Sequence, residues 1–112
     1  MNNYTLILNN ASGNGATVNV NLLNTKKAAL ILRAVNHKLR QQMLKLIDEN
    51  GKMTVTELYL KLRLEQSVAS QHLAILRKAG LVNTIRNGKF IRYSINAERL
   101  EELNEFVKNF LS

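Results

Sequence analysis

The feature that most constrains the fold is a helix followed by a tight hairpin, over residues 66–95. Apolar residues recur at three- and four-residue spacing from Val68 to Ala79, and Gly80 stands where helices commonly end. Beyond it, two stretches alternate with the period of a strand, and Asn87-Gly88 between them is a strong hairpin signal. The sequence therefore predicts a helix, a strand, a tight turn and a second strand.

The predicted helix has an apolar side and a polar side. The apolar side holds Val68, Ala69, Leu73, Ile75, Leu76 and Ala79. The other side is small and polar at its start and basic at its end, and it holds Ser67, Ser70, Gln71, Ala74, Arg77 and Lys78. Short hydroxyl and amide side chains suit close approach to base edges in the major groove of DNA. Taken alone, an ordinary solvated face explains the pattern equally well.

The predicted hairpin carries Arg86, Asn87, Lys89 and Arg92 around its tip, without an acidic residue. Such a loop is suited to contact with phosphate. A helix with a polar, basic face followed by a basic hairpin is the layout of a winged helix-turn-helix. We therefore expect these four residues, with Ser67, Ser70, Gln71, Arg77 and Lys78 on the helix, to contact double-stranded DNA.

Positive charge is concentrated in the same part of the chain. The 112 residues carry a net charge of +8, from 16 basic and 8 acidic side chains. Residues 25–95 hold 14 basic and 4 acidic side chains, whereas residues 1–24 hold no charged side chain. This distribution favours a polyanionic partner, nucleic acid before membrane.

Several classes of protein do not fit the composition. Cysteine is absent, which excludes disulfides, thiolate metal sites and thiol redox switches. We see no secretory signal and no apolar run long enough to span a bilayer, so we expect a cytoplasmic protein without a membrane partner. Glycine-rich phosphate loops, paired-carboxylate motifs and nucleophile elbows are also missing. We therefore expect no enzyme, no cofactor and no metal.

The chain divides into an uncharged Asn-rich segment, residues 1–23, and one domain, residues 24–112. Two interpretations of the segment stay open, a flexible tail or a hairpin, because Thr17, Asn19 and Asn21 alternate with Val18, Val20 and Leu22. Asn24 or Thr25 is predicted to cap the first helix of the domain.

Further helices complete a mainly α fold with about five helices and a β-hairpin wing. One is expected from about Lys38 to Glu49, followed by a short extended piece at residues 52–54. Thr54 and Glu57 form the pattern of a capping box that opens the next helix. The first helix carries an apolar stripe, and so does the last helix, which follows Asn96. So small a core cannot cover both stripes. These stripes predict a two-fold dimer interface that includes Leu30, Ile31, Leu103, Phe106, Val107 and Phe110.

Several of these residues together resemble one family. The chain over about residues 25–111 resembles the ArsR/SmtB family of bacterial winged-helix repressors, by Thr56-Glu57-Leu58, the run Gln66 to Leu73, Leu76, Ala79 to Val82, Gly88 and Tyr93. The resemblance implies a homodimer that binds operator DNA and represses transcription. It places Ser67, Ser70 and Gln71 at the bases and Arg86, Lys89 and Arg92 on the wing.

The chain departs from the family's metal-sensing members. Tyr59 and Lys61 stand where the founding members place their Cys-x-Cys ligands, and neither suits a soft metal. Residues 96–112 contain no His and no Asp, which the family's other metal site uses. By the resemblance, His72 packs and hydrogen-bonds within the motif. We expect an effector that is organic, macromolecular or absent.

Two hypotheses about function follow. The leading one is a sequence-specific DNA-binding regulator, a repressor that binds a palindromic operator as a homodimer. The alternative is a winged-helix module that binds protein and does not read DNA. The basic wing and the small residues on the exposed helix face favour the first.

Overall fold

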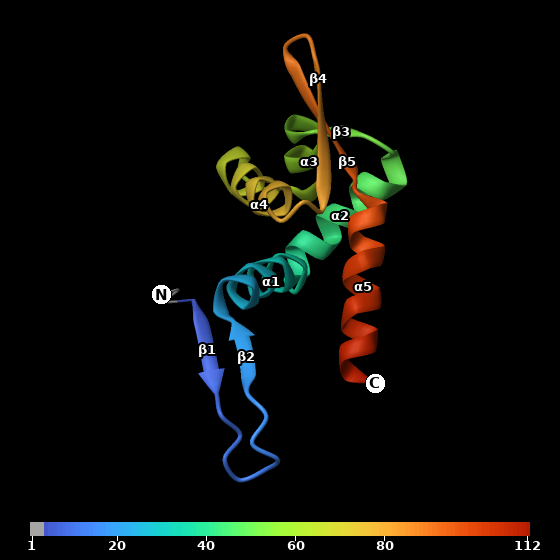
Figure 1. Cartoon of the computed structure of the whole chain (residues 1–112). Coiled ribbons are helices and arrows are strands. Elements are labelled where there is room, and N and C mark those ends of the chain that lie inside the picture. The colour runs from blue at the N-terminus through green and yellow to red at the C-terminus, as the bar shows by residue number, and fades with distance from the viewer. Residues whose placement is uncertain (1–3) are drawn as a thin grey trace. The chain divides into compact units, whose positions relative to one another are not determined.

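The computed structural model describes residues 4–112, and the chain divides after Ile31 into two compact units. These residues form five helices and five short strands. Figure 1 labels them in chain order. Among residues 4–112, no helix combines the length and the apolar content that crossing a membrane requires.

The first unit contains an antiparallel hairpin of β1, Thr5–Leu8, and β2, Val18–Asn21. It continues directly into α1, Leu22–Val35. The predicted cap at Asn24 or Thr25 was wrong, because the Asn21 side-chain oxygen accepts the backbone N–H of Asn24 at 3.0 Å. The helix therefore begins where β2 ends. The division expected between residues 23 and 24 stays a prediction.

The second unit holds the helix-turn-helix and the wing. Helix α2, Lys38–Asn50, precedes α3, Val55–Leu62, and α4, Gln66–Lys78. The capping box at α3 is confirmed, with Thr54 and Glu57 each accepting the other's backbone N–H. Between α3 and α4 the chain turns at Arg63, whose φ of 54° lies in the left-handed region. Helix α5, Ala97–Leu111, follows the wing.

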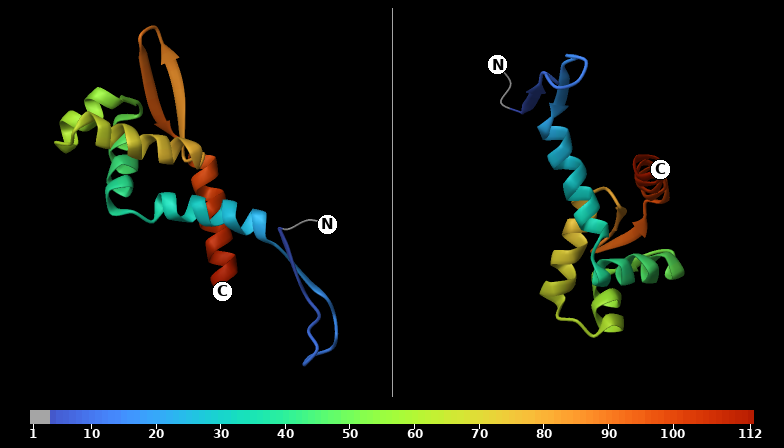
Figure 2. Two further views of the ribbon diagram at one scale, coloured as in Figure 1. Left: turned by 90° about the vertical axis from the view of Figure 1, so that its left-hand side faces the viewer. Right: turned by 90° about the horizontal axis from the view of Figure 1, so that it is seen from below.

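The sheet of this unit is antiparallel, in the order β3-β5-β4. Strand β3, Met53–Thr54, is the predicted extended piece, and it pairs with Tyr93 and Arg92. Strands β4, Val82–Asn87, and β5, Phe90–Ile95, form the wing, which projects past α2, α3 and α4 in Figure 2. The winged helix-turn-helix prediction, with five helices and a hairpin, is confirmed.

The turn of the wing lies one residue beyond the predicted position. Asn87 pairs with Phe90, so the two residues of the turn are Gly88 and Lys89. Only Gly88 of these has a positive φ, 63°, where a type II′ turn places glycine first. The prediction that Asn87-Gly88 lies between the strands was therefore wrong at Asn87, which ends β4 and has no positive φ.

The core of the second unit lies among α2, α3, α4 and the start of β4. Its largest fully buried side chains are Met43, Ile47, Leu58, Leu73, Leu76 and Leu81. Leu73 and Leu76 of α4 are among them. Burying one such side chain stabilises the fold by about 1.5–3 kcal/mol. The core fixes where the remaining side of α4 points.

Candidate nucleic-acid interface

Helix α4 presents one polar side to solvent and buries the other. Ala69, Leu73 and Leu76 are completely buried. All the helix residues predicted to contact DNA are exposed, namely Ser67, Ser70, Gln71, Arg77 and Lys78. They recur at three- and four-residue spacing, so they share one face. The buried side holds this face in a fixed orientation.

Ile75 departs from the expected pattern of α4. It was placed on the apolar side, but 41% of its surface is exposed. Its position, four residues after Gln71, puts it at the border of the polar face. The polar face therefore has one branched apolar side chain at its edge, a shape suited to contact with a thymine methyl group.

Arg40 contacts α4 through His72, and the sequence did not predict this contact. Its side chain, on α2, is 8% exposed and donates to the backbone oxygens of Ala34 at 2.7 Å and Arg33 at 2.9 Å. It also lies 3.1 Å from Nδ1 of His72 on α4. A guanidinium only donates, so Nδ1 accepts and the neutral ring carries its proton on Nε2. One buried cation thus joins the last turn of α1, α2 and α4.

His72 is kept neutral by its surroundings. Burial lowers the pKa of His72, and the charges of His37 and Arg40 lower it further. The His37 and His72 rings lie 4.9 Å apart. These contacts agree with a packing and hydrogen-bonding role for His72. Residues 4–112 hold no cluster of three or more His, Cys, Asp or Glu side chains able to bind a metal ion.

The polar and basic side chains of the wing differ in exposure. Arg86, Asn87 and Lys89 are exposed at the tip, whereas Arg92 is half-buried beside β3. Hydrogen bonds from the backbone and side chain of Thr54 lower the pKa of Glu57, and the charge of Arg92 adds to this effect. Arg92 thus lies in the field of a carboxylate, which offsets part of its charge. Of the three cations, Arg86 and Lys89 are therefore more accessible than Arg92.

The residues predicted for a dimer interface fall on two helices. On α5, Leu103 and Val107 are half-buried, while Phe106 and Phe110 are 47% and 78% exposed. The Phe106 and Phe110 rings lie 5.9 Å apart, which makes a continuous aromatic surface along the helix. Leu30 and Ile31 belong to α1 in the first unit. Their pairing with α5 stays a prediction.

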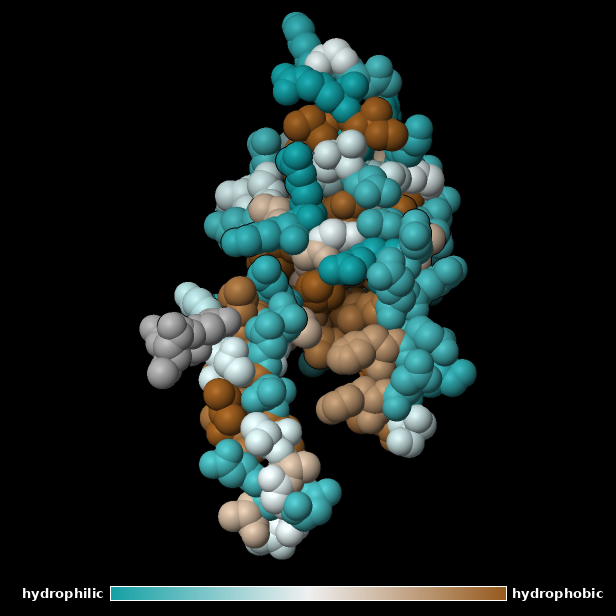
Figure 3. Space-filling view, in the orientation of Figure 1, coloured by the Kyte–Doolittle hydropathy of each residue, from teal (hydrophilic) through white to brown (hydrophobic). Residues whose placement is uncertain are grey.

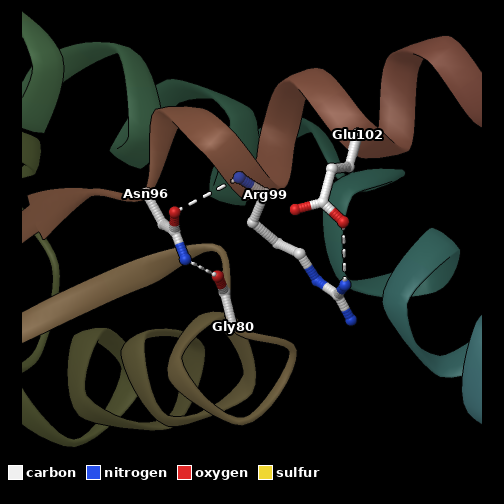
Figure 4. Close-up of polar contacts among 4 residues, drawn as sticks. All are labelled: Gly80, Asn96, Arg99 and Glu102. Carbon is white, nitrogen blue, oxygen red and sulfur yellow. Dashed lines mark hydrogen bonds and ion pairs between the residues drawn. The ribbon is translucent and has the colours of Figure 1, made fainter.

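Asn96 ties α5 to the end of α4, as Figure 4 shows. Its side-chain oxygen accepts the backbone N–H of Arg99 at 3.2 Å, so Asn96 caps α5. Its side-chain nitrogen donates to the backbone oxygen of Gly80 at 2.8 Å. Arg99 also makes an exposed ion pair with Glu102 at 3.6 Å. The first two bonds join the recognition helix, the wing and α5 at one point.

Helix α4 has one buried side, follows a tight turn and precedes a basic hairpin. This arrangement defines a winged helix-turn-helix DNA-binding regulator. Residues 37–84 match the family model described as bacterial regulatory protein, arsR family. The chain is 35% identical over 95 residues to the transcriptional activator HlyU of Vibrio cholerae, covering 83% of this chain and 87% of that protein. The chain therefore belongs to the arsR family, a family of transcription regulators and not of enzymes.

Solved structures agree with this assignment. Reduced HlyU from Vibrio cholerae superposes with a TM-score of 0.59 at 33% identity, covering 80% of this chain and 95% of that one. The transcriptional repressor PagR of Bacillus anthracis gives a TM-score of 0.61 at 27% identity, covering 76% and 97%. An activator and a repressor by name thus resemble the same chain.

Proposed function

We propose that this chain is a repressor that binds a two-fold-symmetric operator as a homodimer in the cytoplasm. The exposed face of α4 carries the proposal: Ser67, Ser70 and Gln71 stand clear of the fold over a fully buried opposite side. Hydroxyl and amide groups are suited to the donors and acceptors of base edges. Arg77, Lys78, Arg86, Asn87, Lys89 and Arg92 are proposed as the contacts that position the helix on the backbone.

The proposed dimer uses the apolar side of α5. Phe106 and Phe110 are large, adjacent and exposed, and a second copy would remove them from water. With two-fold symmetry, the operator half-sites should lie about 34–36 Å apart, one turn of DNA, or a multiple of it. Phe110→Asp is therefore expected to give monomers in analytical ultracentrifugation. Asn109→Asp, which adds the same charge one residue away, is the matched control.

Regulation is proposed to bypass the thiolate metal site of the family. Tyr59 and Lys61 occupy the corresponding positions on α3, and the sequence has no cysteine. The signal is then organic, macromolecular or absent. Binding of operator DNA measured with and without Zn²⁺ tests this, because a metal-responsive regulator would release its operator.

The decisive experiment is selection of bound duplexes from a random pool, read together with the mass of the complex. A palindromic motif bound by two chains supports the proposal. Weak, salt-sensitive binding without an enriched motif would instead favour the protein-binding alternative. Repression is then tested with the enriched motif placed in a promoter, where an activator would raise transcription.

Two substitutions test the assigned roles. Gln71→Ala is expected to weaken binding to the selected motif by about 1–3 kcal/mol, while leaving binding to random DNA nearly unchanged. Lys89→Ala should weaken binding to both and reduce the dependence of affinity on salt, because it removes a phosphate contact. Equal losses on both DNAs for Gln71→Ala would contradict the base-reading role.

A further inference from the structure

The outer half of the wing is supported on neither side by a third strand. Strand β3 reaches only Arg92 and Tyr93 of β5. Beyond those pairs, Arg86 pairs with Ile91 and Asn87 with Phe90, and the turn closes the hairpin. Figure 2 shows these two strands extending past the helices of the second unit. The tip is therefore a narrow ribbon with two open faces.

This ribbon carries more apolar surface than a solvated hairpin tip requires. Ile85, Phe90 and Ile91 are 45%, 59% and 37% exposed. Figure 3 shows hydrophobic residues on the wing directly below its polar end. The same stretch, residues 82–96, has three cations and no acidic residue. The tip thus combines apolar groups with positive charge.

The register assigns these side chains to faces. Directly paired residues share a face of the ribbon, so Phe90 lies with Asn87, and Ile91 lies with Arg86. Ile85 pairs with Arg92, two residues along from Phe90, and so shares its face. Phe90, the most exposed apolar residue of the wing, adjoins the turn residue Lys89. It is the side chain that an object approaching the tip would meet.

Cations around an exposed phenyl ring match the chemistry of the DNA minor groove. Phosphates line its rims, and proteins that enter it often insert an apolar wedge at a base step, which kinks the duplex. A purely apolar protein partner would not require cations such as Arg86 and Lys89 beside the ring, whereas the phosphate rims attract them. The minor groove therefore accounts for both properties of the tip.

We propose that Phe90, at the tip of the wing, acts as an apolar wedge at a base step of the minor groove beside the recognised half-site, while Arg86 and Lys89 bind the flanking phosphates. This inference rests on the proposed DNA-binding function. It implies a preference for A·T pairs under the wing, because the exocyclic amine of guanine projects into the minor groove. It also implies that the bound duplex is bent.

The test uses the full-length protein and duplexes that carry the selected core with flanks of A·T, G·C or inosine·C pairs. Inosine lacks the guanine amine, so inosine·C resembles A·T in the minor groove and G·C in the major groove. The wild-type chain should bind A·T and inosine·C flanks equally, and G·C flanks about tenfold more weakly. Energy transfer between dyes at the duplex ends should report bending on the first two.

Phe90→Ala should abolish the flank preference and the bend, with the core still selected. Ile91→Ala is the matched control, because it removes an exposed apolar residue from the opposite face and should preserve both. Lys89→Ala should weaken binding to all three flanks equally. An unchanged flank preference and bend in Phe90→Ala would overturn the wedge but not the regulator. A wild-type chain that selects no core at all would overturn the proposed function itself.

Discussion

The recognition helix and the wing are held in opposite ways. Helix α4 has one side completely buried and a buried arginine beneath it, whereas the tip of the wing is held by pairing between two strands. Base reading depends on hydrogen bonds whose geometry tolerates little error. Contact with phosphate depends mainly on charge and tolerates more. The difference indicates that the core positions α4, which is proposed to contact the bases, more firmly than it positions the tip of the wing.

The largest expected effect comes from removing a core contact of α4. Leu73→Ala should lower the free energy of unfolding by about 2–5 kcal/mol, because it leaves a cavity at a fully buried position. Urea denaturation measures it. Phe90→Ala on the wing should change the same quantity by less than about 0.5 kcal/mol. Similar losses of unfolding free energy in both variants would show that α4 and the wing tip are held equally firmly.

The next effect concerns the buried arginine under α4. Arg40→Met keeps an unbranched apolar side chain but leaves His72 Nδ1 and two backbone oxygens without their donor. The free energy of unfolding should fall by about 1–3 kcal/mol. Thermal unfolding measures the loss, and the exposed Arg33→Met serves as the control. If Arg33→Met costs as much, the buried contacts do not stabilise α4.

A smaller effect, confined to the wing, is expected at the turn. Gly88 has a φ of 63° with open space around it, so an alanine there meets backbone strain alone. Gly88→Ala should make opening of the wing about 1 kcal/mol easier. Amide hydrogen exchange would show faster exchange in β4 and β5 with α4 unchanged. Gly88→Asn should cost less, because asparagine tolerates this conformation.

The smallest effect is a pH dependence of stability. The pKa of His72 is lowered in the folded chain, so the unfolded chain binds more protons near pH 6.5. Stability should therefore fall as the pH drops from 7 through 6.5 towards the folded pKa, and be fully present above that range. Urea denaturation across this range measures the slope. His72→Asn, which keeps an acceptor for Arg40, should flatten it.

Local signals made much of the site predictable. The capping box at Thr54, the glycine after α4 and the alternation on either side of Gly88 each depend on residues within one turn or strand. Such signals need no knowledge of distant partners. For that reason the exposed face of α4 and the position of the wing could be derived from the sequence.

The sequence predictions failed where the structure depends on contacts between residues outside one turn or strand. Arg40 is a surface residue by type, and its burial depends on carbonyl oxygens of α1 and on His72, 32 residues along the chain. Asn21 caps α1 because a strand runs directly into the helix, which displaced the predicted start. Ile75 had the right spacing for the core, but 41% of its surface is exposed. Spacing indicates which side a residue occupies, not what lies opposite.

The double hydrogen bonding of Asn96 has a mechanical consequence. One amide side chain fixes both the first turn of α5 and the carbonyl that follows α4. Any rotation of α5 about its own axis must drag the carboxyl end of α4 with it or break that bond. A molecule that tilts α5 would therefore displace the end of α4 through this one side chain.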